Sequence, residues 1–273
     1  LGLVGSAAAP SVVTAYRRPQ NLHNALWIVI SQSGRSPDLV AATEMARKAG
    51  ALTLALVNDE ISPVASMCEL VLPIDAGTEQ SVAATKTVVL SMIAGATLVA
   101  ELANEADLKD ALSELPVRMS NALQCDWSVW ADRAAFAPAA FVVGRGYGLG
   151  CAREIALKVS ETLRVPALGY SAAELRHGPR ASISPTTPVL FLRQSDASAA
   201  AVDDLFQDLQ REGDLVCSAG GPAGTLPWIG DSHPALDPAL MLIPAYRAIE
   251  SAAINKGLDP DNPPHLTKVT HTL

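Results

Sequence analysis

One unit of sequence occurs twice in this chain, and that repeat constrains the fold more than any other feature. The unit is an apolar run followed by a polar turn and a helical pattern, and it starts at residues 25–30 in the first copy and at residues 187–192 in the second. Each helical pattern ends at a glycine, Gly50 or Gly213, and leads into another apolar run. A strand, a helix and a strand joined by short links form a parallel crossover unit. The repeat therefore predicts an α/β fold with doubly wound parallel sheets, in which the strand at residues 25–30 is buried on both faces.

Two lobes follow from the repeat, residues 1–125 and residues 126–273. In the second copy a strand at residues 141–144 and a helix at residues 147–163 precede the turn. The first copy has no equivalent before its own turn, so we expect its lobe to lack one N-terminal strand and helix, about 25 residues by typical element lengths. Each lobe is expected to be a three-layer α/β/α sandwich.

Helices are also predicted outside the repeated unit, at residues 80–104, 106–125 and 244–256. The first of them contains the longest apolar stretch of the chain, which is interrupted by small and polar residues and stops before Glu101. It is therefore shorter than the roughly 20 residues that a membrane-spanning helix needs. The pattern predicts a buried helix and no membrane partner.

The composition limits the partners and the chemistry. The chain has 273 residues, is 49% hydrophobic and carries a formal net charge of −8 without a block of Lys or Arg. This balance provides a folded core and no basic surface for nucleic acid. The cysteines are scattered without Cys-x-x-Cys spacing, at Cys68, Cys125, Cys151 and Cys217, which favours reduced thiols in the cytoplasm. The five histidines show no ligand spacing, so neither a metal nor another cofactor is expected.

The turn of the first copy has the parts of an anion site. It reads SQSGRS at residues 31–36, directly between a strand and a helix, and so offers backbone N–H groups, three hydroxyls and Gly34 for close approach. The residues alone leave open that Ser33 and Ser36 only cap the helix. In the second copy Asp196 stands in place of Gly34 and puts a carboxylate where an anion would bind. We therefore expect phosphate binding in the first lobe alone.

Several motifs extend the pattern over nearly the whole chain. They are SQSG at 31–34, AGTE at 76–79, ATK at 84–86, GRG at 144–146, ALKVSE at 156–161, AELRHGP at 173–179, DNP at 261–263 and LTK at 266–268. In this order they resemble the sugar isomerase (SIS) domain proteins, specifically the tandem SIS isomerase half of glucosamine-6-phosphate synthase and SIS-type glucosamine-6-phosphate deaminases. The resemblance implies two tandem SIS lobes.

The resemblance also implies roles for particular residues. The sugar phosphate would be held by Ser31, Gln32, Ser33 and Ser36, and Val82 and Lys158 would contact the substrate. Glu161 would move a proton between C1 and C2, His177 would assist ring opening, and Lys268 would handle the open-chain carbonyl. An aldose–ketose interconversion needs one base positioned over two adjacent carbons, and Glu161 follows Lys158 by about one helical turn.

Each of these residues also has a simpler interpretation. Without the motif, Glu161 would be interpreted as a solvent-exposed helix residue paired with Lys158. His177 would be interpreted as a histidine at a helix C-terminus before Gly178, where the helix dipole favours it. Lys268 alone reads as a disordered charge in the tail. One departure from the synthase pattern is Ala84, which stands where the synthase has a serine that contacts the phosphate.

Glutamine-dependent synthesis is not expected of this chain, because it has no N-terminal cysteine nucleophile and its 273 residues are expected to hold only the two lobes. The expected reaction is the isomerisation in reverse, from glucosamine 6-phosphate to fructose 6-phosphate and ammonia. Alternatives are another phosphosugar isomerase, a deglycase, or a non-catalytic regulator that binds a sugar phosphate. The resemblance further implies a homodimer, in which His177 completes either its own site or that of the neighbouring subunit.

Overall fold

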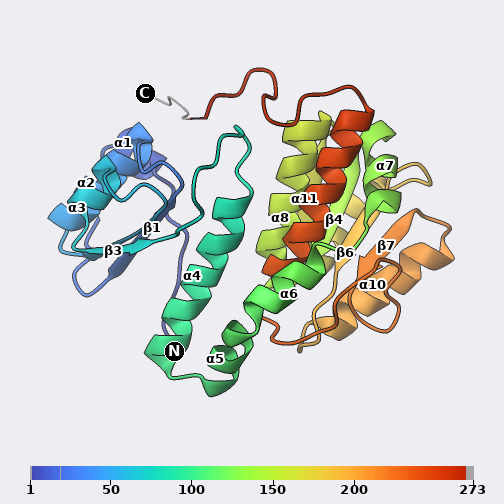
Figure 1. Ribbon diagram of the computed structural model, residues 1–273, viewed down its shortest axis with the longest axis horizontal. Helices are drawn as coiled ribbons and strands as arrows, with labels where there is room; N and C mark the ends of the chain where they lie inside the picture. Colours follow the sequence, from blue (N-terminus) through green and yellow to red (C-terminus); the bar gives the residue numbers. More distant parts are fainter. Residues whose placement is uncertain (1, 19, 269–273) are drawn as a thin grey trace. The chain divides into compact units, whose positions relative to one another are not determined.

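The computed structural model describes residues 2–18 and 20–268, which form two compact units (Figure 1). The first unit runs to Ala103 and includes the C-terminal segment that begins at His265, and the second is Asn104–Pro264. The units divide earlier in the chain than the predicted domain boundary after Cys125, because the helix that precedes Cys125 packs against a helix of the second unit. The domain boundary itself stays a prediction.

The first unit contains a parallel three-stranded sheet in the order β1-β2-β3. Its elements are α1 (Ser11–Thr14), β1 (Leu26–Ser31), α2 (Pro37–Lys48), β2 (Leu52–Val57), α3 (Pro63–Met67), β3 (Leu70–Pro73) and α4 (Lys86–Ala103). β1 and β2 pair in register from Leu26 opposite Leu52 to Ser31 opposite Val57. The predicted strand–helix–strand unit is therefore confirmed here.

The core of the first unit lies on one face of this sheet. It joins Val29, Ala55 and Val57 of the strands to Val64 and Ala65 of α3, with side chains of α2 packed against them. Successive strand residues point to opposite faces. On the other face Leu26, Ile28 and Ile30 are 46%, 44% and 53% exposed. The prediction that this strand is buried on both faces is therefore wrong for the described chain.

Helix α4 begins at Lys86, later than the predicted start at residue 80. Residues 80–85 are not helical, because a side chain from the preceding loop binds the backbone N–H groups at the start of the helix. Its buried residues are Thr87, Val89, Ser91 and Ala100, so the predicted buried helix is only partly buried. Among the described residues α4 is the one helix long and apolar enough to cross a membrane, a criterion that core helices of soluble proteins also meet.

The second unit contains a parallel four-stranded sheet in the order β5-β4-β6-β7. Its elements are α5 (Ala106–Ser113), α6 (Leu115–Ala122), α7 (Ser128–Phe136), β4 (Ala140–Gly144), α8 (Gly148–Lys158), the π-helical turn η1 (Val159–Leu163), β5 (Ala167–Ser171), α9 (Ala172–Arg176), the 3₁₀ turn η2 (Pro179–Ser182), β6 (Val189–Leu192), α10 (Ala199–Arg211), β7 (Val216–Ala219) and α11 (Asp237–Asn255). The predicted α/β class with parallel sheets is confirmed, whereas two complete tandem lobes and the loss of a strand and helix from the first stay predictions.

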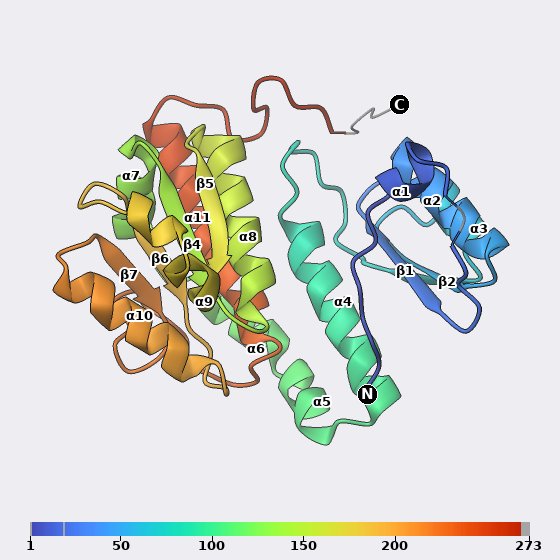
Figure 2. The ribbon, with the colours of Figure 1, turned by 180° about the vertical axis from the view of Figure 1, so that it is seen from behind.

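Helices cover both faces of the second sheet (Figure 2). On one face α9 and α10 pack on the strands around Phe141, Phe191 and Phe206, and the rings of Phe191 and Phe206 meet edge to face at 5.4 Å. On the other face α8 packs against β4 and β5, and α11 packs against α8. This three-layer arrangement fixes α8 against the sheet on one side and α11 on the other.

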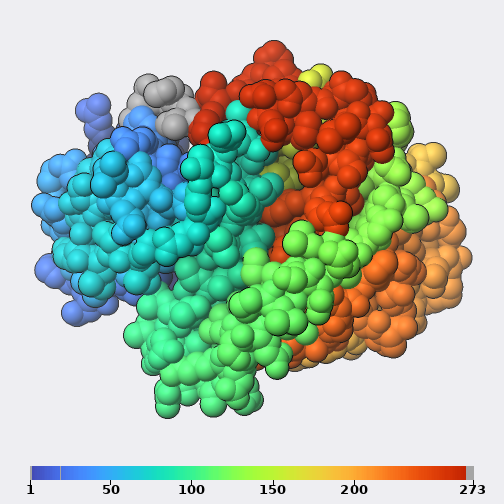
Figure 3. Space-filling view, viewed as in Figure 1, coloured from blue at the N-terminus to red at the C-terminus, as the bar shows by residue number. Residues whose placement is uncertain are grey.

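Two prolines explain where the helices depart from prediction. The helix predicted at residues 106–125 is split into α5 and α6, since Pro116 lies in the first turn of α6, where proline is tolerated. The helix predicted from Pro244 begins earlier, at Asp237, and passes through Pro244. An interior proline costs about 3 kcal/mol, but most of α11 is buried against α6, α7 and α8, which outweighs that cost. In the space-filling view red atoms from the C-terminal part of the second unit lie beside the green segment that contains α6 and α7 (Figure 3).

Candidate functional site

The predicted phosphate turn lies at the carboxyl end of β1. The Gly34 N–H donates to Ser31 Oγ at 3.0 Å, and the Arg35 N–H donates to Ser33 Oγ at 3.3 Å. Ser36 occupies the N-cap position of α2, but its side chain makes no capping hydrogen bond. Within the described residues the hydroxyl of Ser36 and the amide of Gln32 have no protein partner, so the interpretation of Ser36 as a helix cap is not supported. The turn thus has hydroxyl and amide groups to offer to a ligand.

Gly34 is required by the shape of this turn. Its φ is +59°, a conformation that glycine adopts without strain. A Cβ at this position would lie 2.6 Å from Cβ of Ser62 and closer still to its hydroxyl. Ser62 in turn accepts a hydrogen bond from the Ala65 N–H at the start of α3. The turn is therefore seated directly against the N-terminus of α3.

The equivalent turn of the second unit contains its own anion. One carboxylate oxygen of Asp196 accepts hydrogen bonds from the Ser198 N–H at 2.7 Å and from its hydroxyl at 2.5 Å. Gly146, in the GRG loop after β4, lies beside the Asp196 carboxylate and Ser198. The Asp196 carboxylate therefore accepts the hydrogen bonds of Ser198 that would otherwise be available to an anionic ligand in this turn.

Removing this internal anion is expected to cost stability. We expect Asp196→Ala to lower the free energy of unfolding by about 1–2 kcal/mol, because it leaves the Ser198 N–H and hydroxyl without their acceptor. Urea unfolding measures the change, with Asp204→Ala on the exposed side of α10 as the matched control. Equal stability of the two variants would contradict the assigned contact.

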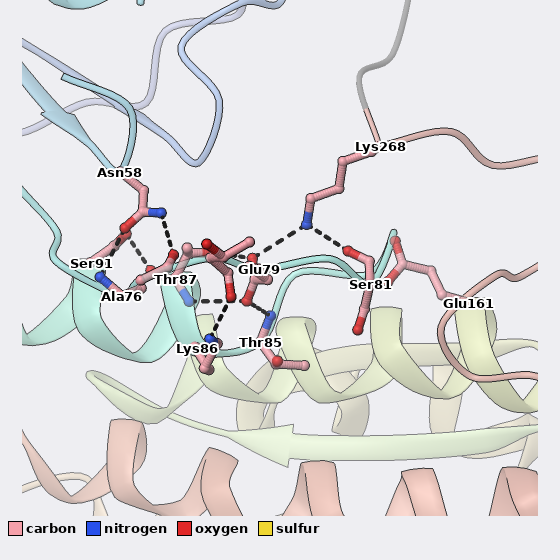
Figure 4. Close-up of polar contacts among 12 residues, drawn as sticks. Asn58, Ala76, Glu79, Ser81, Thr85, Lys86, Thr87, Ser91, Glu161 and Lys268 are labelled. Carbon is pink, nitrogen blue, oxygen red and sulfur yellow. Dashed lines mark hydrogen bonds and ion pairs between the residues drawn. The ribbon is translucent and has the colours of Figure 1, made fainter. Parts of the chain in front are cut away.

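A loop after β3 forms the second part of the site in the first unit (Figure 4). Asn58, directly after β2, accepts a hydrogen bond from the Ala76 N–H and donates to the Gly77 carbonyl, each at 2.8 Å. The Lys86 ammonium donates to the Thr78 carbonyl at 2.8 Å. Parallel strands end at one edge of their sheet, so this loop, which includes Val82, lies at the same edge as the phosphate turn.

Lys268 binds this loop. Its ammonium donates to the Ser81 carbonyl at 2.5 Å and lies 3.5 Å from a carboxylate oxygen of Glu79 (Figure 4). The interpretation of Lys268 as a disordered charge is therefore not supported. Ser81 directly precedes Val82, so this contact places the Lys268 ammonium at the edge of the sheet where the predicted phosphate turn lies.

The second unit brings together a buried cluster of alternating charges. The Lys158 ammonium lies 2.6 Å from the carboxylate of Glu161 and 3.2 Å from that of Glu154, and Tyr246 of α11 donates to Glu154 at 2.9 Å. The side chain of Lys158 is only 5% exposed and that of Glu161 is 21% exposed. The pair is therefore not the solvated surface pair of the simpler interpretation. Two carboxylates share one ammonium, and burial raises the pKa of Glu154 above its usual range despite Lys158 and Tyr246.

This cluster predicts a pH dependence of stability. Because the pKa of Glu154 is raised in the folded state, the folded chain binds more protons than the unfolded chain between about pH 4.5 and that raised value. The contribution of Glu154 to stability therefore falls as the pH rises through this window, by at most about 1.4 kcal/mol per pH unit. We expect Glu154→Gln to remove that decline, measured by urea unfolding from pH 4 to pH 8. An unchanged pH profile would contradict the assignment.

Glu161 lies in a π-helical turn that continues α8. The hydroxyls of Ser160 and Thr162 donate to the carbonyls of the residues four positions earlier, Ala156 and Lys158. These carbonyls therefore have a hydrogen-bond donor other than the backbone N–H groups of an α-helix. The Lys256 ammonium binds the Leu163 carbonyl at 3.0 Å and so satisfies the end of the turn. Single π-helical turns within helices are frequent at functional sites.

His177 lies at the C-cap of the short helix α9 and is exposed. No hydrogen bond or ion pair joins it to Glu161 among the described residues, so its role stays a prediction. Sequence reasoning missed Glu154, Tyr246, Asn58 and the contact of Glu79 with Lys268. Glu154 precedes Lys158 by four residues on the same helix and could have been found by that spacing, whereas Tyr246 is distant in sequence.

These features define the class of the protein. It is an α/β protein with a serine-rich turn after β1 in one unit and a largely buried cluster of Lys158 with Glu154 and Glu161 in the other, and the described residues contain no group of three or more potential metal ligands. The chain belongs to the SIS domain family, which it matches over residues 23–101 and 137–226. These two segments contain the two copies of the repeated unit, and the predicted family is confirmed.

Known relatives agree with this assignment. The chain is 31% identical to a glutamine–fructose-6-phosphate aminotransferase (isomerizing) of Zymomonas mobilis, over 93% of this chain and 45% of the relative. A Halobacterium salinarum relative of the same name is 33% identical, over 89% of this chain and 43% of the relative. The chain thus spans about half the length of these curated relatives and is homologous to their isomerase half.

Solved structures show the same fold. A Silicibacter pomeroyi protein that carries the provisional name phosphosugar isomerase matches with a TM-score of 0.90 and 37% identity, over 96% of this chain and 81% of that one. The glucosamine-6-phosphate deaminase of Thermotoga maritima matches with a TM-score of 0.81 and 22% identity, over 96% of this chain and 80% of that one. The second likeness shows the fold alone.

Proposed function

We propose that this protein is a phosphosugar aldose–ketose isomerase that converts glucosamine 6-phosphate to fructose 6-phosphate and ammonia. The observation that supports this most directly is the ion pair of Glu161 with the buried Lys158, which holds a carboxylate in place within a π-helical turn. The SIS family, and relatives that act on fructose 6-phosphate by name, support the substrate class.

The first step of the proposed reaction is phosphate binding in the lobe of residues 1–125. The hydroxyls of Ser31, Ser33 and Ser36 and the amide of Gln32 donate to the phosphate oxygens at the N-terminus of α2, where the helix dipole favours negative charge. Val82 and Lys158 contact the sugar. His177, from the same or the neighbouring subunit of a homodimer, moves a proton from the C1 hydroxyl to the ring oxygen and so opens the ring.

Proton transfer follows in the open chain. The Glu161 carboxylate removes the proton from C2, and the electrons move to the C1 carbonyl oxygen. The proton on Glu161 exchanges with solvent, and Glu161 then delivers a proton to C1. The Lys268 ammonium stabilises the oxygen that gains charge. The product is a ketimine at C2, which takes up one water and releases ammonia and fructose 6-phosphate. In this proposal the lobe of residues 126–273 supplies the base. Residues of this chain are assigned to each step of the reaction.

A second candidate is isomerisation of another phosphosugar without loss of ammonia. The 37% identity to the Silicibacter pomeroyi protein with the provisional name phosphosugar isomerase favours it over a deglycase or a non-catalytic sugar-phosphate regulator. We place either activity in the cytoplasm, in keeping with the scattered cysteines, none of which forms a disulfide in the structure.

A panel of phosphorylated sugars and aminosugars tests the proposal. Coupled assays for ammonia and for ketose are run on the protein with each compound. Both products from glucosamine 6-phosphate support the deaminase, and ketose without ammonia from another aldose phosphate supports the second candidate. Neither product from any compound would contradict an enzymatic function and favour the regulator.

A further inference from the structure

A buried carboxylate at Glu79 connects the C-terminal segment with the start of α4. The Glu79 side chain is only 2% exposed. One of its oxygens accepts hydrogen bonds from the N–H groups of Thr85 at 3.0 Å and Thr87 at 3.3 Å, and the other accepts from the Thr87 hydroxyl at 2.7 Å (Figure 4). The two bonds from backbone N–H groups cap the N-terminus of α4, and the hydroxyl bond adds a side-chain contact. They also fix the orientation of the carboxylate.

The Glu79 carboxylate is charged, and it has a cation beside it as well as the groups at the start of α4. Burial raises the pKa of Glu79, but the hydrogen bonds from Thr87 and Thr85 outweigh burial and hold that pKa below its usual range, so the group is ionised. A buried charge is stable when it is paired. Among the described residues, Lys268 is the cation within 4 Å of this carboxylate.

The same loop supplies a second acceptor to the ammonium. The Ser81 carbonyl lies 2.5 Å from Lys268 Nζ, and the loop that presents it is held by Asn58 at one end and by Glu79 at the other. The ammonium is therefore bound by one charged group and one neutral group, both on a loop fixed by hydrogen bonds on either side.

We propose that Glu79 is a positioning residue that holds the Lys268 ammonium at the Ser81 carbonyl and so docks the C-terminal segment at the sugar-phosphate site. The proposal rests on the proposed function only for the role of Lys268 in the reaction. Glu79 itself touches no substrate. It acts through the lysine, and its removal leaves Lys268 with one neutral acceptor.

Three variants separate this role from helix capping. Glu79→Gln keeps the oxygen that accepts from Thr85 and Thr87 and removes the charge that faces Lys268. Thr87→Val removes the bond from the Thr87 hydroxyl and keeps that charge, so it serves as the matched structural control. Lys268→Met removes the ammonium itself.

Chemical labelling of amines tests the contact without turnover. Each full-length variant is treated briefly with acetic anhydride, and mass spectrometry compares acetylation of Lys268 with that of Lys48, whose side chain is 73% exposed. We expect Glu79→Gln to raise the relative labelling of Lys268 about three- to tenfold, and Thr87→Val to leave it unchanged. Unchanged labelling in Glu79→Gln, or an equal rise in Thr87→Val, would overturn the proposal.

Kinetics test the link to the site. We expect Glu79→Gln to lower kcat in the wild-type background and to have no further effect in the Lys268→Met background. Independent, multiplicative losses would contradict a role through Lys268. If Lys268→Met keeps full activity, the assigned role of the lysine fails, while the labelling result still decides whether Glu79 holds it.

Discussion

The Glu161→Gln variant is expected to lose about 10³-fold in kcat on glucosamine 6-phosphate, with KM nearly unchanged. Glutamine keeps the size of the side chain and an oxygen that can accept from Lys158, so the π-helical turn is retained. It cannot accept a proton from carbon. The loss therefore falls on the chemical step, and steady-state assays of ketose and ammonia measure it.

The matched control for this variant is Glu250→Gln on the exposed side of α11. It makes the same change of charge in the same unit and is expected to leave kcat within about twofold, as surface substitutions usually do. Thermal unfolding of both variants checks that the fold is retained. A Glu161→Gln variant as active as this control would contradict the role of Glu161 as the base.

The Ser36→Ala variant is expected to raise KM for phosphorylated substrates about tenfold or more, because a hydrogen bond to a charged group is worth about 1.5–3 kcal/mol. Stability is expected to change by less than about 0.5 kcal/mol, since the Ser36 side chain makes no capping bond in the structure. The two results together separate ligand binding from helix capping. Steady-state kinetics and urea unfolding measure them on the same protein.

The second copy of the repeat supplies the control. Ser198→Ala changes the serine that corresponds to Ser36, but its hydroxyl already donates to Asp196. We expect Ser198→Ala to lower stability and to leave KM unchanged, the opposite of Ser36→Ala. A rise in KM for Ser198→Ala, or none for Ser36→Ala, would mean that the phosphate is not bound in the first turn.

Much of the fold could be predicted because the repeated unit carries its own local signals. The strand β1 and the helix α2 follow from an apolar run, a proline at the start of the helix and a glycine after it. The strand β5 was missed because its sequence ALGYS has no continuous apolar run and is only partly buried. The start of α11 was missed because its proline is tolerated only through burial among other helices.

The same distinction applies to the site. The contact of Lys158 with Glu161 spans one helical turn, so spacing alone predicts it. The donation from Tyr246 to Glu154 and the binding of Lys268 to Ser81 join residues that are far apart in the chain. Such contacts depend on tertiary packing, which local patterns do not encode. The end of the π-helical turn at Glu161 is likewise bound by Lys256, which follows α11 and is distant in the chain.

Hydrogen exchange at the substrate carbons tests the central claim most directly. The protein is incubated with glucosamine 6-phosphate in D₂O, and NMR follows deuterium at C1 and C2 of substrate and product. We expect deuterium to enter at C1 of fructose 6-phosphate in the presence of the wild-type protein and not in the presence of Glu161→Gln. Equal turnover or equal deuterium incorporation by wild type and Glu161→Gln, or neither turnover nor exchange by either protein, would contradict proton transfer by Glu161.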